Sequence, residues 1–237
     1  METPGVKENP VISVIIPALN EEKAIGKVLS DIPKDLVQEI IVVDNGSTDR
    51  TPEIASANGA TVLRAPRKGY GSACLFAVQY LERKTPDIVV FVAGDYSDDP
   101  TRMQTLVDPI LKGEADFVLG SRMLGQMEKG SMTPQSYFGN KLAGFLIRLF
   151  FGFTYTDLGP FRAITYEALL KLKMKDQDFG WTVEMQIKAL EQNLKILEKP
   201  VPYRCRIGKS KVSGTLWGTF MASYKILWTI FRYALLR

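Results

Sequence analysis

The chain has 237 residues, enough for one large α/β domain, and its formal charge of +4 is too mild to indicate a nucleic-acid-binding protein. Histidine is absent, which excludes Ser-His-Asp triads, histidine acid–base catalysis and most zinc enzymes. Cys74 and Cys205 have no C-x-x-C spacing, so we expect a reducing compartment and neither a disulfide framework nor a zinc site. The polar residues 1–9 do not have the pattern of a signal peptide.

The first half of the sequence alternates apolar runs with segments of helical periodicity. Strands are predicted at residues 11–16, 40–43, 61–63, 89–92 and 117–119, and helices within 20–32, 51–58, 72–80 and 101–112. Asn20 and Asp99 are predicted helix caps, with Pro100 at the first helical position. This order predicts an α/β fold with a mostly parallel central sheet and helices on both faces.

Acidic loops follow three of the predicted strands, at residues 17–21, 44–49 and 94–99. Parallel strands end at one edge of a sheet, so we expect these loops to meet at one crevice. Asp95 directly follows the strand at 89–92, where a carboxylate can serve a metal and phosphate site. Asp and Asn are also common turn and cap residues, so no single loop is specific. Convergence of the three loops is the stronger signal.

Motifs along nearly the whole chain resemble the GT-A, family 2 glycosyltransferases, most closely the branch of dolichyl- or polyprenyl-phosphate sugar transferases. They are I-P-A-L-N-E-E (16–22), V-V-D-N-G-S-T-D (42–49), R-K-G-Y-G (67–71), G-D-Y-S-D-D-P (94–100), G-S-R (120–122), D-L-G-P-F-R (157–162), W-T-V-E (181–184) and G-K-S-K (208–211). The resemblance implies a GT-A fold and an inverting transfer of a hexose from a nucleotide-diphosphate sugar. We expect a catalytic domain over residues 1–211.

By the resemblance, the nucleotide-binding residues are Pro17, Ala18, Asn20, Glu21, Asp44, Asn45, Gly46, Lys68, Gly71, Gly94 and Asp95. Whether the base is uracil or guanine stays open. The family's D-x-D metal motif has Ala93 in its first position, which leaves Asp95 as the carboxylate for Mg²⁺ or Mn²⁺. This departure leaves two alternatives: an active enzyme, or a catalytically weak nucleotide-sugar-binding scaffold.

Cationic residues in the later part of the chain suit an acceptor phosphate. The expected acceptor-phosphate residues are Arg122, Arg162, Arg206, Lys209, Ser210 and Lys211. A lipid phosphate is already ionised and needs no base. A hydroxyl of a sugar, protein or small molecule would need one, and without histidine it would be Asp157 or Glu184. The expected catalytic residues are therefore Asp95, Arg122, Asp157 and Glu184, with the two acceptor classes left open.

Residues 212–237 are predicted to form an amphipathic helix rich in aromatic side chains. Lys225 and Arg232 interrupt it seven residues apart, which favours a helix lying in the membrane surface over one that spans it. The apolar segment 142–153 is too short to span. Packing on the chain's own domain or on a partner is the alternative. We therefore expect a cytoplasmic, peripherally membrane-associated enzyme; a second copy or a membrane protein as partner stays open.

Overall fold

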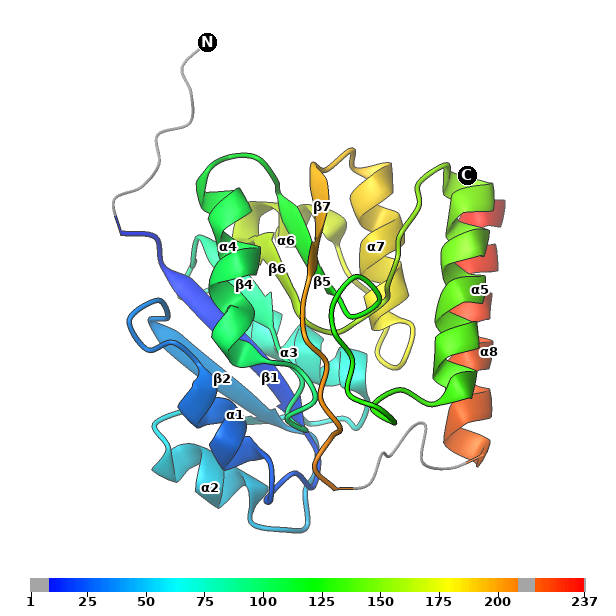
Figure 1. Cartoon of the computed structure of the whole chain (residues 1–237). Coiled ribbons are helices and arrows are strands. Elements are labelled where there is room, and N and C mark those ends of the chain that lie inside the picture. Colours follow the sequence, from blue (N-terminus) through cyan, green and yellow to red (C-terminus); the bar gives the residue numbers. More distant parts are fainter. Residues whose placement is uncertain (1–8, 209–215, 237) are drawn as a thin grey trace.

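The computed structural model describes residues 9–208 and 216–236. Its centre is a seven-stranded sheet in the order β3-β2-β1-β4-β6-β5-β7, with helices on both faces (Figure 1). All neighbouring strands are parallel except for the two pairs that involve β6. The predicted α/β fold with a mostly parallel sheet is confirmed.

The strands are β1 (Ile12–Ala18), β2 (Glu39–Asp44), β3 (Thr61–Arg64), β4 (Ile88–Phe91), β5 (Phe117–Ser121), β6 (Arg162–Thr165) and β7 (Ile196–Pro200). The helices are α1 (Ile25–Asp31), α2 (Thr51–Ala57), α3 (Tyr70–Leu81), η1 (Pro100–Arg102), α4 (Met103–Leu111), α5 (Pro134–Phe151), α6 (Tyr166–Leu172), α7 (Trp181–Glu191) and α8 (Leu216–Leu235).

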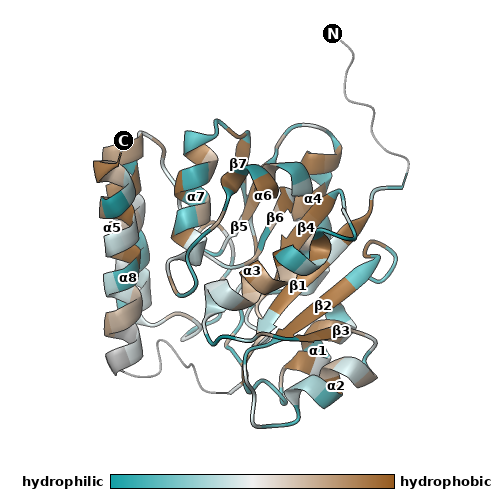
Figure 2. Ribbon diagram, turned by 180° about the vertical axis from the view of Figure 1, so that it is seen from behind, coloured by the Kyte–Doolittle hydropathy of each residue, from teal (hydrophilic) through white to brown (hydrophobic). Residues whose placement is uncertain are grey.

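The core consists of two apolar layers, one on each face of the sheet. Side chains of α1, α2 and α4 cover one face, and side chains of α3 and α5 to α8 cover the other. The strands between them are mostly hydrophobic, as the brown ribbons in Figure 2 show. Strands buried on both faces have continuous apolar sequences, which is why the runs at 11–16 and 89–92 predicted them.

Strand β6 lies antiparallel between β4 and β5, and this reversal was not predicted. Phe91 is paired with Arg162, and Leu119 is paired with the same residue from the other side. Because β6 runs in the opposite direction, the loop before it, residues 157–161, lies at the edge where β4 and β5 end. This loop therefore lies at the same edge of the sheet as the loops that follow the parallel strands.

The two predicted helix caps have different outcomes. Asp99 caps η1, where its carboxylate accepts a hydrogen bond from the Thr101 N–H, and Pro100 is the first residue of the helix. The prediction for Asn20 was wrong, because α1 begins at Ile25 without a side-chain cap. Asn20 has a positive φ of 52°, and its Oδ1 accepts a hydrogen bond of 2.8 Å from the Thr48 N–H. Its side chain therefore joins two loops instead of starting a helix.

Helix α8 lies beside α5 and α7 and is fixed to the body by polar contacts (Figure 1). Lys225 forms an ion pair of 3.1 Å with Asp176, and the Tyr233 hydroxyl donates a 2.7 Å hydrogen bond to Glu184. Lys225 thus faces the domain. Glu184, only 1% exposed, also pairs with Lys188 at 2.9 Å. Burial alone would raise the pKa of Glu184, but hydrogen bonds from the Asp176 N–H, Lys188 and Tyr233 lower it overall.

We expect Glu184→Ala to lower the free energy of unfolding by about 3–5 kcal/mol, because it leaves the buried Lys188 ammonium without its carboxylate. Chemical denaturation measures this loss. Glu167→Ala is the matched control, since Glu167 forms the same i,i+4 pair with Lys171 on the exposed surface, and its loss should be much smaller. The pKa of Glu184 is lower in the folded state than in the unfolded state, where it is about 4.3. The carboxylate therefore contributes stability above about pH 4.3, and this contribution is lost as the pH falls through the pKa of the folded state. The difference between wild type and Glu184→Ala should therefore shrink in acid; equal losses for the two variants would contradict the prediction.

Candidate active site

A cleft of about 460 Å³ opens at the sheet edge where β1 and β4 end. It is lined by Pro17, Ala18, Leu19, Glu21, Asn45, Lys68, Gly69, Tyr70, Ala93, Gly94, Asp95, Pro160, Phe179 and Arg206. Most of the residues predicted to hold the nucleotide are in this lining. We call it the crevice below.

The three acidic loops contact one another as predicted. The backbone N–H of Asn20 donates to Ser47 Oγ at 2.9 Å, and the Glu21 N–H donates to Thr51 Oγ1 at 2.8 Å. These bonds connect the loop after β1 to the loop after β2 and to the first residue of α2. The loop after β4 joins them through a guanidinium group, described next. The convergence expected from strand order is therefore confirmed.

Arg206 bridges two carboxylates that come from different loops of the crevice. Its Nη1 lies 3.1 Å from Asp95 Oδ2, and its Nη2 lies 3.0 Å from Glu21 Oε1. The other oxygen of Asp95 accepts hydrogen bonds from the N–H and hydroxyl of Ser97. The backbone around Arg206 is fixed to the same loop, since the Ile207 N–H donates to the Asp95 carbonyl at 2.9 Å. Two acidic oxygens thus converge on one cationic group.

The turn that precedes α3 forms another wall of the crevice. Asn45 holds Gly69 by two reciprocal hydrogen bonds, of 2.7 Å from its amide nitrogen and 3.1 Å to its amide oxygen. Gly69 has a φ of 133°, and a Cβ built on it would lie 2.2 Å from the Gln177 carbonyl oxygen. The residue must therefore be glycine. A Cβ built on Gly71 would likewise lie 2.2 Å from the Asp176 carbonyl oxygen. Gly71 is not in the crevice lining.

A second cavity, of about 480 Å³, lies at the ends of β2 and β3. Asp44, Gly46 and Arg64 are among its lining residues. Asp44 is buried, and its Oδ1 accepts a 3.0 Å hydrogen bond from the Ser47 N–H. Lys68 lies close to Gly46 while also lining the crevice, so it stands between the two cavities. Asp44 and Asp95 are therefore at the same sheet edge but in adjacent cavities.

Arg122 and Asp157 form a buried pair. Asp157 accepts hydrogen bonds of 2.7 Å from both Arg122 Nε and Nη2, and further bonds from the backbone N–H groups of Arg122 and Leu158. The guanidinium carbon lies 4.9 Å from the ring centroid of Tyr203. Burial alone would lower the pKa of Arg122, but the Asp157 charge and its hydrogen bonds raise it overall. Both oxygens of Asp157 are thus engaged, which does not suit a general base.

Arg162 is buried in the core, which contradicts its predicted place on an acceptor phosphate. Only 1% of its surface is exposed, and its guanidinium donates to the carbonyls of Thr182 and Gly159. Burial lowers the pKa of Arg162. The physical reason is the register of β6: Arg162 is level with Phe91 and Leu119, whose side chains belong to the apolar layer beneath α7. We leave Arg162 out of the acceptor site.

Glu184, one of the four predicted catalytic residues, also lies outside the crevice. It lines a separate cavity of about 190 Å³ between α8 and residues 175–178. Its oxygens accept from the Lys175 N–H, Asp176 N–H and Tyr233. Neither Glu184 nor Asp157 is in the crevice lining. Lys209, Ser210 and Lys211 lie outside the described residues.

Asp98 lies in the predicted acidic loop but was not among the predicted site residues, and it is 1% exposed. Its Oδ2 accepts a 2.9 Å hydrogen bond from the Ala93 N–H, and its Oδ1 has no partner in the described structure. Burial raises the pKa of Asp98 to about 7, and the nearby charge of Asp95 acts in the same direction. Its place in the acidic stretch 95–99 was the available signal, but cap chemistry explained that stretch equally well.

Tyr70 and Phe179 are lining residues that were also missed. Tyr70 lies within the R-K-G-Y-G motif, and Phe179 lies two residues before the W-T-V-E motif, so both were next to residues already singled out. Phe179 reaches the crevice because the loop 176–179 hydrogen-bonds to the start of α3, where the Ser72 N–H donates to the Gln177 carbonyl at 2.8 Å. A contact over this sequence separation leaves no local pattern.

Comparison with known proteins adds family and fold relationships to this geometry. Residues 13–172 match the family model described as glycosyl transferase family 2. The dolichyl-phosphate hexose transferase of Haloferax volcanii is 36% identical over 210 residues, which cover 85% of this chain and 86% of that protein. The low-salt glycan biosynthesis hexosyltransferase Agl6 of the same organism is 33% identical over 210 residues, covering 86% of this chain and 50% of Agl6. This chain thus spans about half the length of Agl6.

Solved structures share the fold. Glucosyl-3-phosphoglycerate synthase from Mycobacterium tuberculosis, in complex with Mn²⁺, UDP and glucosyl-3-phosphoglycerate, is 26% identical with a TM-score of 0.77. The match covers 97% of this chain and 81% of that structure's chain. It is consistent with a mixed sheet flanked by helices. On the family match and these relatives, the chain is a glycosyltransferase that belongs to glycosyl transferase family 2.

Proposed function

We propose that this glycosyltransferase transfers a hexose, with inversion, from a UDP- or GDP-linked sugar to a polyprenyl or dolichyl monophosphate at a membrane surface. The observation that carries the lipid acceptor is an outward apolar surface on the two helices α5 and α8. The likeness to a named dolichyl-phosphate hexose transferase supports the same acceptor class. The donor class is supported by the crevice and by the UDP bound in the related synthase.

The donor side rests on the residues around Asp95. Carboxylate oxygens of Asp95 and Glu21 lie next to one cationic group, the guanidinium of Arg206. Carboxylate oxygens are the ligands that Mg²⁺ and Mn²⁺ prefer. In residues 9–208 and 216–236 no group of three or more acidic, histidine or cysteine side chains forms a metal cage. A cation on Asp95 would therefore share its coordination with diphosphate oxygens, as Mg²⁺ commonly does. When bound, it would neutralise the departing diphosphate.

The proposed reaction is a single displacement. A phosphate oxygen of the acceptor supplies the electron pair for a new bond to the anomeric carbon, and the bond from that carbon to the donor's diphosphate breaks. The electron pair of the broken bond leaves on the diphosphate oxygen, so no proton needs to move. This suits the site, because the two candidate bases, Asp157 and Glu184, are held in buried ion pairs. Attack from the face opposite the leaving group inverts the anomeric centre.

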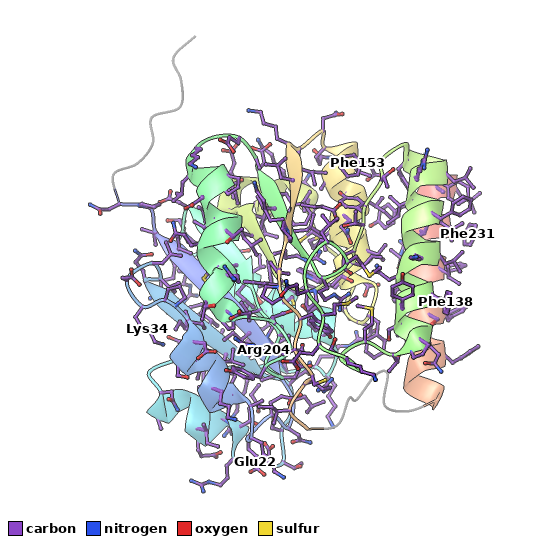
Figure 3. All side chains as sticks on the ribbon, in the orientation of Figure 1. Glu22, Lys34, Phe138, Phe153, Arg204 and Phe231 are labelled. Atoms are coloured by element: carbon purple, nitrogen blue, oxygen red, sulfur yellow. The ribbon has the colours of Figure 1, made fainter. Side chains whose placement is uncertain are left out.

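The apolar surface consists of large side chains that project from α5 and α8 into solvent. They are Phe138, Leu142, Phe145 and Leu149 on α5, and Phe220, Met221, Tyr224, Trp228, Phe231 and Leu235 on α8. We call this set the α5/α8 face; Figure 3 labels Phe138 and Phe231 on it. Phe145 is 60% exposed and Trp228 is 53% exposed. A patch of this kind is expected at a membrane or protein interface.

The orientation of α8 supports a membrane surface. Lys225 and Tyr233 contact Asp176 and Glu184 of the domain, while Phe220, Tyr224, Trp228 and Phe231 are exposed to solvent. Aromatic side chains are the ones that favour the interfacial region of a bilayer. No helix in the described ranges is long and apolar enough to cross a membrane. We therefore propose that the α5/α8 face rests on the membrane and brings the crevice to the lipid phosphate.

Asp95→Asn should lower the rate of hexose transfer by about 100-fold or more, because the crevice loses the carboxylate that would hold the cation against the diphosphate. Transfer is measured with radiolabelled UDP- and GDP-sugars and polyprenyl phosphate in the presence of Mn²⁺. The control is Asp35→Asn, an exposed aspartate away from the crevice, which should keep the wild-type rate. Nucleotide binding by the wild type without turnover of any donor would support the weak-scaffold alternative instead.

A second acceptor class is favoured by one observation, the phosphoglyceric acid held by the related synthase. Parallel assays with polyprenyl phosphate and 3-phosphoglycerate, using the same donors, separate the two. We expect product only with the lipid phosphate, and its rate should rise in vesicles. Glu184→Gln should leave the rate per folded molecule unchanged, since the Glu184 side chain lines a different cavity. Transfer to the soluble acceptor alone, or a selective loss in Glu184→Gln, would contradict the lipid-phosphate proposal.

The double variant Phe145→Glu/Trp228→Glu should weaken binding to vesicles by at least about tenfold, because burying a large apolar side chain is worth about 1.5–3 kcal/mol. Flotation with vesicles of mixed neutral and anionic lipids gives the bound fraction. Leu170→Glu is the matched control, an exposed apolar residue on α6 outside the α5/α8 face, and should float like the wild type. Wild-type protein that stays with the soluble fraction would refute membrane association.

A further inference from the structure

We propose that Arg206 is the cation that pairs with Asp95 before ligands bind. Its guanidinium leaves Asp95 only when it can bind the diphosphate of a nucleotide instead. This inference rests on the proposed function and concerns how the donor and the divalent cation bind together. In the family's motif a second carboxylate would stand at position 93, where this chain has Ala93. The crevice therefore has one fewer acidic group with which to attract a metal ion.

The geometry makes Arg206 a direct competitor for that ion. The guanidinium lies 3.1 Å from Asp95 Oδ2, an oxygen that a divalent cation on Asp95 would use. The same group lies 3.0 Å from Glu21, so it pairs with both carboxylates of the crevice at once and offsets one of their two negative charges. Two cations at one carboxylate oxygen would repel each other strongly in a partly buried site. Without nucleotide, metal binding must therefore include the cost of displacing Arg206.

A diphosphate offers the guanidinium a better set of acceptors. The Arg206 Nε atom is buried and has no hydrogen-bond partner in the described structure, so the planar group has a donor left over. Arginine binds phosphate oxygens with paired, charge-assisted hydrogen bonds. Only the side chain has to move, because the backbone is held by the Arg204 N–H on the Ser97 carbonyl and the Ile207 N–H on the Asp95 carbonyl. Movement of Arg206 to the diphosphate frees Asp95.

This exchange makes the two ligands dependent on each other. Nucleotide should strengthen cation binding, and by thermodynamic linkage the cation should strengthen nucleotide binding by the same factor. Removal of Arg206 should then have two opposite effects. The cation alone binds more tightly, because Asp95 is free, whereas the nucleotide binds less tightly, because it has lost a phosphate contact. Simple damage to the crevice would weaken both.

The test is a Mn²⁺ titration followed by electron paramagnetic resonance, in which the signal of the free hydrated ion reports binding without any need for catalysis. Wild type, Arg206→Gln and Arg206→Lys are titrated alone and with UDP or GDP. Without nucleotide, Arg206→Gln should bind Mn²⁺ on the order of tenfold more tightly than wild type, and Arg206→Lys should fall between them. In Arg206→Gln the strengthening by nucleotide should be smaller than in wild type, because only the coordination that the ion shares with the diphosphate remains.

Arg204→Gln is the matched control, because Arg204 lies on the same segment but pairs with Asp31 and Asp99 and is not in the crevice lining. It should behave like the wild type. The added affinity of Arg206→Gln should vanish in Asp95→Asn/Arg206→Gln, which would locate the ion at Asp95. Thermal unfolding of each variant shows whether it is folded. If Arg206→Gln does not fold, Arg206→Lys, which keeps the charge, is used for the test in its place.

Unchanged or weaker Mn²⁺ binding by Arg206→Gln without nucleotide would overturn the inference. That result is distinct from failure of the proposed function. If wild type binds UDP or GDP with Mn²⁺ while the Arg206 variants show no gain, the donor proposal stands and the exchange does not. If neither nucleotide binds wild type with or without Mn²⁺, both are overturned.

Discussion

The parallel pairing of β1 with both β2 and β4 is the constraint on which the candidate site depends. Ala18 is level with Asp44 across one pair, and Ile15 is level with Phe91 across the other. A strand running in the opposite direction at either position would carry its loop to the far edge of the sheet. Because the three strands end at the same edge of the sheet, Glu21, Asn45 and Asp95 can line one crevice although they are far apart in sequence. The buried apolar runs that form the strands thus also determine where the acidic groups meet.

Charge in this molecule is divided between groups held in the interior and groups that face the crevice. Arg122 with Asp157, and Lys188 with Glu184, are buried pairs whose hydrogen bonds are largely satisfied within the protein. Breaking such a pair costs folding free energy, so we interpret these residues as structural groups that hold the backbone near the crevice. Arg206 with Asp95 and Glu21 is different, since its side chain is partly exposed and one of its donors has no partner in the described residues. This difference is why we assign ligand exchange to Arg206.

The sequence predicted the first half of the fold well because local patterns determine it. Continuous apolar runs identified five strands, and acidic turns after them indicated the crevice. Strand β6 escaped prediction because its sequence, R-A-I-T, has no continuous apolar run, and its charged residue Arg162 is buried by a contact with the Thr182 carbonyl, which is distant in sequence. Asn20 was assigned to a helix cap because a cap and a hydrogen bond between two loops both use a side-chain oxygen that accepts from a backbone N–H. Asp157 and Glu184 have the chemistry of a base, and only their partners show that their oxygens are engaged.

The attachment of α8 also determines how the helix is turned about its own axis. Lys225 and Tyr233 contact Asp176 and Glu184 at points about 12 Å apart along the helix, given a rise of about 1.5 Å per residue. Rotation of the helix would separate both contacts. Its aromatic side chains consequently keep a constant angle to the crevice, and any surface that accepts them meets the whole protein in a single pose. The distance from that surface to Asp95 is then a fixed property of the fold.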